Sequence, residues 1–185
     1  MAEIDERLDR VRKLLKDPDF LAGNGLSNEV NIRICCYDAA DEMRVRHFIK
    51  QIMADQSLPC NLKEKNLYEI FLSCCEDKRI LNRMGQMEEK KGKDVLQKQI
   101  EKAITVKDYV DKICEHPFEK GDVILLTGIG DVFPFMRVHI LLEALQPKVS
   151  ATPILVMYPG VFDGRHLKLF DRLPANPYYR AFNII

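Results

Sequence analysis

Residues 121–131 read Gly-Asp-Val-Ile-Leu-Leu-Thr-Gly-Ile-Gly-Asp, and residues 153–164 read Pro-Ile-Leu-Val-Met-Tyr-Pro-Gly-Val-Phe-Asp-Gly. Each stretch contains an unbroken apolar run, at residues 123–126 and 154–157, instead of an alternation of apolar and polar residues. Unbroken runs are typical of strands in a parallel sheet that is covered on both faces. The two stretches therefore predict the central parallel strands of an α/β domain.

A helix is expected after the strand at residues 123–126. Gly128 and Gly130 interrupt the apolar run and predict a tight turn. Asp131 is placed to accept hydrogen bonds from the first free amides of a helix, and Pro134 fits its first turn. Apolar residues then recur at helical spacing, which predicts that the helix packs back on the sheet; they are Met136, Ile140, Leu141, Ala144 and Leu145.

The remaining chain alternates further strands and helices. Helical periodicity or capping residues predict helices over residues 4–15, about 38–53 and 67–79, and strands are expected over residues 31–37 and 58–63. In the second helix Asp38 and Asp41 resemble a capping box, and the expected apolar face is Met43, His47, Phe48, Ile52 and Met53.

The order of elements predicts the fold class. Residues 80–115 read as a charge-rich helical excursion with a bend at Gly92, and a short helix and a last strand are expected after residue 164. Alternation of this kind predicts an α/β fold: a three-layer, Rossmann-like domain with a mostly parallel sheet of about five strands. We expect residues 1–185 to form this single domain.

Composition narrows the classes of function. The 185 residues include 28 Lys and Arg and 28 Asp and Glu, so the net charge gives no reason to expect direct binding to nucleic acid. No apolar run is long enough for a membrane span, and the charged start does not resemble a signal peptide. The six cysteines have no C-x-x-C spacing, so we expect buried thiols, no zinc site and a cytoplasmic protein.

Ligands of open α/β sheets lie beyond the carboxyl ends of the strands. The residues that the sequence places at or near this rim are Asp38, Gly128, Gly130, Asp131, Tyr158, Gly160, Asp163 and Gly164. A Walker-type loop is excluded because Asp131 and Val132, not lysine and a hydroxyl residue, follow Gly130. A dinucleotide loop is only half present because Phe133 occupies the third glycine position, so no cofactor is expected.

Some rim residues permit two interpretations. Asp38, Asp131 and Asp163 would hold Mg²⁺ if they converged, but the more ordinary roles are helix caps and a turn. His139 is either a general base or a buried structural histidine in the middle of a helix. Arginines also fit two roles, an anionic or partner surface and ordinary solvated ion pairs; those considered are Arg137, Arg165, Arg172 and Arg180.

The chain also resembles the BrxB family of BREX, the bacteriophage-exclusion systems of bacteria and archaea. The resemblance is carried by residues 126–134 (LTGIGDVFP), 137–139 (RVH), 158–164 (YPGVFDG), 167–170 (LKLF) and 178–182 (YYRAF), and by residues 21–29 (LAGNGLSNE) together with Tyr37 and Asp38. The matching segments span nearly the whole chain, but residues 80–115 contribute nothing specific.

The resemblance implies an accessory protein of a phage-defence system that methylates host DNA and blocks phage replication. It implies binding to other BREX proteins, above all to the alkaline-phosphatase-like component PglZ, and it supplies no catalytic residues. Our first hypothesis is accordingly an interaction module that binds its partner through the rim. The competing hypotheses are a metal-dependent phosphoesterase or nuclease that uses the three aspartates, and a nucleic-acid-binding subunit.

Overall fold

The protein is built around a mostly parallel sheet, as the sequence predicts. The computed structural model describes residues 2–22, 31–149, 151–178 and 182–183. Its central strands follow the order β2-β3-β4-β1-β7, and every neighbouring pair in this order is parallel. These strands are β1 (Ile32–Tyr37), β2 (Asn61–Asn66), β3 (Asp122–Thr127), β4 (Ile154–Phe162) and β7 (Phe182–Asn183).

The two apolar runs form the centre of this sheet. β3 and β4 pair with Ile124 opposite Ile154, and all six residues of β3 are buried. On its other side β4 pairs with β1, from Ile32 opposite Ile154 to Tyr37 opposite Pro159. The predicted parallel arrangement of the two runs is therefore confirmed, and burial on both faces explains why the runs are unbroken.

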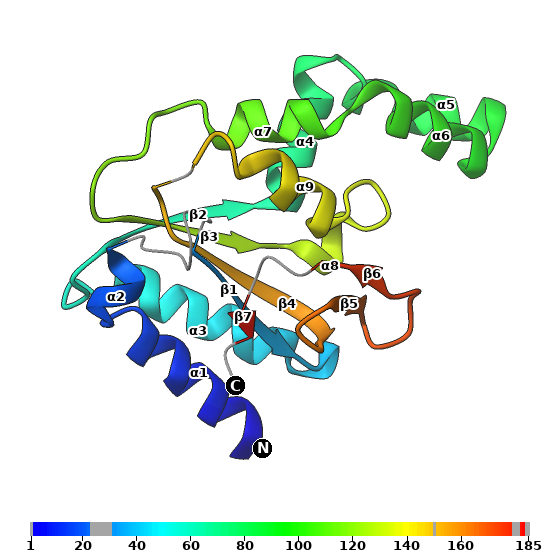
Figure 1. Ribbon diagram of the computed structural model, residues 1–185. Coiled ribbons are helices and arrows are strands. Elements are labelled where there is room, and N and C mark those ends of the chain that lie inside the picture. The colour runs from blue at the N-terminus through cyan, green and yellow to red at the C-terminus, as the bar shows by residue number, and fades with distance from the viewer. Residues whose placement is uncertain (1, 23–30, 150, 179–181, 184–185) are drawn as a thin grey trace.

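Helices cover both faces of the sheet (Figure 1). One face packs against α1 (Ala2–Leu14), α2 (Pro18–Leu21) and α3 (Glu42–Ala54), and the other against α4 (Leu67–Asp77), α7 (Val106–Ile113), α8 (Ile129–Val132) and α9 (Val138–Leu145). Side chains along a strand alternate between the faces. Leu125 and Leu155 therefore join the cluster under α1 and α3, while Ile124 and Leu126 join the cluster under α4, α7 and α9.

A helical arm projects away from the sheet between α4 and α7 (Figure 1). It comprises η3 (Leu81–Arg83), α5 (Met84–Lys91) and α6 (Lys93–Ala103), and the chain reverses at Gly92, whose φ of 79° glycine adopts without strain. Lys78 anchors the base of the arm, because its ammonium donates to the carbonyl of Ala103 at 2.5 Å and pairs with Asp108 at 2.7 Å.

The segment after β4 differs from the prediction of a short helix. It forms β5 (His166–Leu169) and β6 (Asn176–Pro177), which extend β4 as an antiparallel ribbon. Gly160 makes this ribbon possible, since a Cβ there would lie 2.3 Å from the carbonyl oxygen of Lys168. The last strand is described only at β7, and the rest of the expected span beyond Tyr178 lies outside the described residues.

The connection from β3 to α9 corrects four expectations. Asp131 caps no long helix; it lies inside the single turn α8, whose N-cap is Gly128. Pro134 lies in the loop after α8 and not in a first turn, because α9 begins only at Val138. His139 is consequently the second residue of α9 and not a mid-helix residue, and Ile140 is 43% exposed instead of packed on the sheet.

Helix α3 buries Phe48 and Ile52 as expected, but the rest of its buried face differs from the prediction. Met43 and Met53 are 74% and 40% exposed, and the residues that pack are Val45, Phe48, Ile49 and Ile52. The expected capping box is also wrong. Asp38 caps the 3-10 turn η2 (Ala39–Asp41) through the amide of Ala40, whereas α3 starts at Glu42. No helix in the described part of the chain is both long and apolar enough to cross a membrane.

Candidate functional site

The topology directs attention to the carboxyl ends of β1 and β3. β1 leads into α3 on one face of the sheet, β3 leads into α8 and α9 on the other, and β4 lies between them (Figure 1). Connections that leave in opposite directions open a crevice beyond the strand ends, where α/β proteins bind their ligands. The carboxyl edge of the sheet is therefore the candidate site in this fold.

A hollow of about 610 Å³ occupies this position, and we call it the rim hollow. It lies between α3, α8 and the ends of β1, β2 and β3. Its lining comprises Tyr37, Glu42, Met43, Arg46, His47, Ile49, Lys50, Glu64, Asn66, Glu69, Thr127, Gly128, Asp131 and Met157. Two predicted site residues, Gly128 and Asp131, belong to it.

A chain of polar contacts joins the two sides of the rim hollow. The hydroxyl of Tyr37 donates to Glu42 at 2.7 Å, and Arg46 donates to Glu42 at 2.7 Å and to Asp131 at 2.5 Å. Burial raises the pKa of Tyr37, and the neighbouring carboxylate of Glu42 raises it further, so the phenol stays protonated and remains a donor. Asp131 is thus held by an arginine of α3 and is not free to cap a helix.

The opposite wall is fixed by two contacts between β2 and β3. The hydroxyl of Thr127 donates to Glu64 at 2.7 Å. Gly128 has φ 68° and carries no Cβ against Asn66, whose side-chain oxygen would lie 2.3 Å from such an atom. The same oxygen of Asn66 accepts from the amides of Tyr68 and Glu69 and caps α4. Gly128 is therefore required by its conformation and by this close approach.

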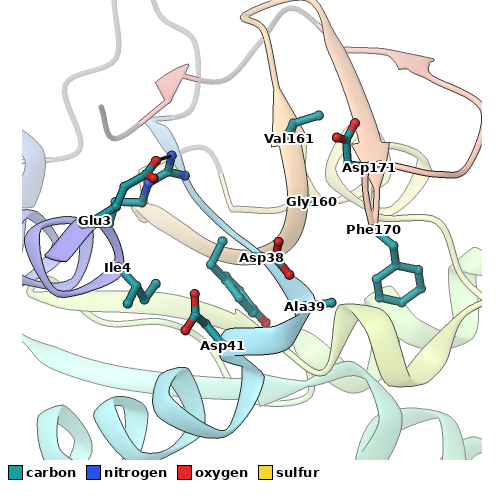
Figure 2. A pocket seen from close by; sticks show the side chains of 11 residues that line it. Glu3, Ile4, Asp38, Ala39, Asp41, Gly160, Val161, Phe170 and Asp171 are labelled. Atoms are coloured by element: carbon teal, nitrogen blue, oxygen red, sulfur yellow. Dashed lines mark hydrogen bonds and ion pairs between the residues drawn. The ribbon is translucent and has the colours of Figure 1, made fainter. Parts of the chain in front are cut away.

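A second hollow, of about 250 Å³, lies on the other side of the β1 end (Figure 2). Figure 2 shows that α1 contributes Glu3 and Ile4, while Asp38 and Asp41 lie between them and Phe170. Arg7, also in its lining, donates to the carbonyl of Cys36 at 2.8 Å and to Glu3 at 2.6 Å. The 3-10 turn that Asp38 caps therefore separates two hollows, each of which Tyr37 lines.

Two of the predicted rim glycines serve packing. A Cβ on Gly130 would lie 3.0 Å from the ring of Phe170 and 3.2 Å from Pro159. Gly160 approaches the backbone of β5 as described above, and it also lines the second hollow. Substitution of either residue would disturb the β4–β5 ribbon.

The structure separates the other predicted residues from the rim hollow. Arg137, His139 and Tyr158 line a small hollow of about 40 Å³, where Arg137 donates to Asn176 at 3.3 Å. Burial lowers the pKa of His139, which favours the neutral imidazole. Asp163 and Gly164 lie in the turn between β4 and β5, and Arg180 lies outside the described residues.

The three aspartates that would share a metal ion each have another role. Asp38 accepts from the amide of Ala40, Asp131 pairs with Arg46, and Asp163 accepts from the amide of His166 at 2.7 Å. Amide hydrogen bonds lower the pKa of Asp163, as expected for a carboxylate that organises a turn. Across residues 2–22, 31–149, 151–178 and 182–183, no three His, Cys, Asp or Glu side chains are grouped to hold a metal ion.

Sequence reasoning missed most of the lining of the rim hollow. Glu42 and Arg46 stand four residues apart on α3, which is the spacing of an ion pair on one helix face, so this pair was detectable. Glu64 and Asn66 could not be assigned to the rim from the sequence, because β2 was expected three residues earlier in the chain than the structure places it. Met43 was assigned to the core because helical spacing alone does not say which of two neighbouring apolar stripes is buried.

Comparisons with known proteins agree with one another. The family model described as "BREX protein BrxB" matches residues 63–184. A BREX protein BrxB of Bacillus cereus (strain H3081.97) is 35% identical over 192 aligned positions, which cover 100% of this chain and 99% of the relative. One from Escherichia coli O9:H4 (strain HS) is 29% identical, over 98% of this chain and 92% of the relative. No solved structure matches the chain.

Proposed function

Because the chain belongs to the BrxB family of BREX phage-defence proteins, we propose that it is a non-enzymatic accessory component that binds another BREX protein, foremost PglZ. The proposed contact surface is the carboxyl edge of the sheet, centred on the rim hollow. Other BREX components are further partners, and neither nucleic acid nor a membrane is a direct one.

The observation that carries this proposal is the network of hydrogen-bonded polar side chains in the lining of the rim hollow. Tyr37 and Arg46 both donate to Glu42, and Arg46 also pairs with Asp131, which gives a preformed polar network at the place where this fold class binds ligands. Beside them stands Met43 with 74% of its surface exposed. A satisfied polar network next to an exposed methionine suits a protein interface, whose centre favours methionine and whose polar groups are paired.

We extend the proposal to the whole molecule. Residues 1–185 would form one Rossmann-like, three-layer domain, which is supported by helices on both faces of a parallel sheet (Figure 1). The place of action would be the cytoplasm. The support is that the six cysteines are free, which suits a reducing compartment.

The test is co-purification of the chain with PglZ, followed by titration calorimetry. Lys50→Glu and Glu69→Lys place opposite charges on the exposed rim, and Lys90→Glu makes the same change on the arm as a matched control. We expect the wild type and the arm variant to bind alike and each rim variant to bind at least ten-fold more weakly. A wild-type chain that binds neither PglZ nor any other BREX component would overturn the proposal.

A further inference from the structure

Strand β2 forms one edge of the parallel sheet (Figure 1). It pairs with β3 along its whole length, from Asn61 opposite Asp122 to Asn66 opposite Thr127. No strand in the described part of the chain pairs with its other side. An edge strand of this kind offers unpaired N–H and C=O groups on which a further strand can assemble.

The backbone groups that β2 leaves free belong to Leu62 and Glu64. Successive residues of a strand direct their N–H and C=O groups to opposite sides. The amide of Asn61 donates to the carbonyl of Gly121 at 2.9 Å, on the β3 side, so the second and fourth residues of β2 point the other way. No hydrogen bond joins these outward backbone groups to any other residue that the structure describes.

Two lysines give one face of β2 a positive charge. Lys63 and Lys65 stand opposite residues of β3 that belong to the cluster under α4, α7 and α9. The side chain of Lys63 is 48% exposed, and its ion pair with Asp122 is long, at 3.8 Å. Lys65 lies 5.9 Å from the centre of the Phe118 ring and has no ion pair among the described residues. Because cross-strand neighbours on one face interact directly, an added strand gains most when it carries acidic side chains opposite these lysines.

A second copy of this chain fits the edge poorly. Outward residues must face outward residues, so the longest antiparallel registers of two β2 strands place Leu62 opposite Glu64, or Glu64 opposite Glu64. The first register sets Lys63 against Lys63, and the second sets Lys63 against Lys65. Like charges directly opposite each other destabilise a strand pair. The occupant that the charges favour is therefore a different chain.

We propose that β2 is extended by a strand of the BREX partner, and that this strand carries acidic residues at two alternate positions that face Lys63 and Lys65. This inference rests on the proposed function and names a second part of the same docking surface. The edge is continuous with the rim hollow, because Glu64 and Asn66 of β2 line that hollow. The outward backbone groups supply the affinity, and the two lysines select the strand.

A proline substitution tests the backbone pairing, with PglZ as the partner. Glu64→Pro removes an outward N–H that makes no bond to β3, and edge strands tolerate proline at such positions. Glu64→Ala is the matched control, because it loses the same side chain but keeps the N–H. We expect Glu64→Pro to bind at least ten-fold more weakly than Glu64→Ala in titration calorimetry, with urea unfolding showing that both variants are folded.

A charge reversal tests the choice of strand and does not depend on the folding of the proline variant. The double substitution Lys63→Glu and Lys65→Glu reverses the charge of the β2 face. The same double change at Lys90 and Lys93, which are exposed on the arm, is its control. We expect the β2 variant to bind PglZ at least five-fold more weakly than the wild type, and the arm variant less than two-fold.

Residue-resolved hydrogen exchange provides a second readout. We expect the amides of Leu62 and Glu64 to exchange at least ten-fold more slowly in the complex than in the free chain. Binding without this protection, or equal binding by Glu64→Pro and Glu64→Ala, would overturn the edge pairing and leave the accessory function standing. A dimer of the free chain that Glu64→Pro abolishes would also overturn it, since the occupant would then be a second copy. A wild type that binds no BREX protein would overturn both proposals.

Discussion

The two faces of the sheet differ in how completely they are covered. Among the described residues, 30 buried side chains form the cluster under α4, α7 and α9, whereas 15 form the cluster under α1 and α3. The smaller cluster lies beside the rim hollow and on the face of Met43, which is 74% exposed, more than any other large apolar side chain in the described part of the chain. The larger face thus supplies most of the stability, and the smaller face retains the surface that we assign to binding.

The largest expected effect on the free energy of unfolding comes from two substitutions in β3, one on each face of the sheet. Leu125 and Leu126 are neighbours in β3 and fully buried, but they belong to the smaller and the larger cluster respectively. We expect Leu126→Ala to lower the free energy of unfolding by about 4 kcal/mol and Leu125→Ala by about 3 kcal/mol, because the denser side relaxes less around a cavity. Urea unfolding measures both, and a larger loss for Leu125→Ala would reverse the comparison.

The next effect concerns the turn where the two faces meet at the rim. Gly128→Ala would strain a residue at φ 68° and push Asn66 away from the amides that it caps. We expect a loss of about 2 kcal/mol, roughly half from strain and half from the cap. In an Asn66→Ala background the same substitution should cost only about 1 kcal/mol, and equal costs in both backgrounds would show that the cap is not involved.

A pH effect on stability is expected at Asp108, which lies in α7 on the larger face. Burial acts to raise the pKa of Asp108, but hydrogen bonds from Lys78 and Thr105 outweigh it and lower the pKa to about 2. Because the folded pKa lies below the unfolded one, the stabilisation is complete above about pH 4 and is lost as the pH falls toward 2. Asp108→Asn should cost about 1 kcal/mol at pH 7 and flatten the acid limb of a pH series of melting curves. An unchanged acid limb would argue against this role.

The smallest effect is expected at the ion pair on the smaller face. Arg46 and Asp131 have side chains that are 46% and 41% exposed, so water screens their attraction. We expect Asp131→Ala to change the free energy of unfolding by less than about 0.5 kcal/mol, measured by urea unfolding at low salt. A loss above about 1.5 kcal/mol would mean that this network stabilises the fold and is not mainly a surface feature.

The sequence predicts the centre of the fold because burial on both faces leaves a direct mark. The unbroken runs of β3 and β4 and the stripe of α1 are such marks, and each element is present. The β5–β6 ribbon has no comparable sequence pattern, because its strands are short. It also depends on the close approach of Gly160 to the backbone of β5 at Lys168. The helix boundaries predicted near Asp131 and Pro134 were wrong because Gly128, and not Asp131, is the N-cap of the single turn α8, and α9 begins only at Val138.

The site is less predictable than the fold. The topology rule selects the edge at which the rim hollow lies, and Gly128 and Asp131 line that hollow. Arg137 and His139 were also predicted at the rim, but they line another hollow. Glu64 and Glu69 reach the rim from β2 and α4, and only the strand order, which a single sequence does not reveal, brings them there.

Two adjacent thiols in β1 make the difference between the faces measurable in real time. Cys35 points into the smaller cluster and Cys36 into the larger one, and burial raises the pKa of each thiol to about 12. We expect each thiol to react with an alkylating reagent only after the helices on its own face have locally unfolded. The order in which the two thiols are modified therefore reports which face unfolds first. Fragment-ion mass spectrometry separates the two positions, and the thiol under α1 and α3 should be modified first.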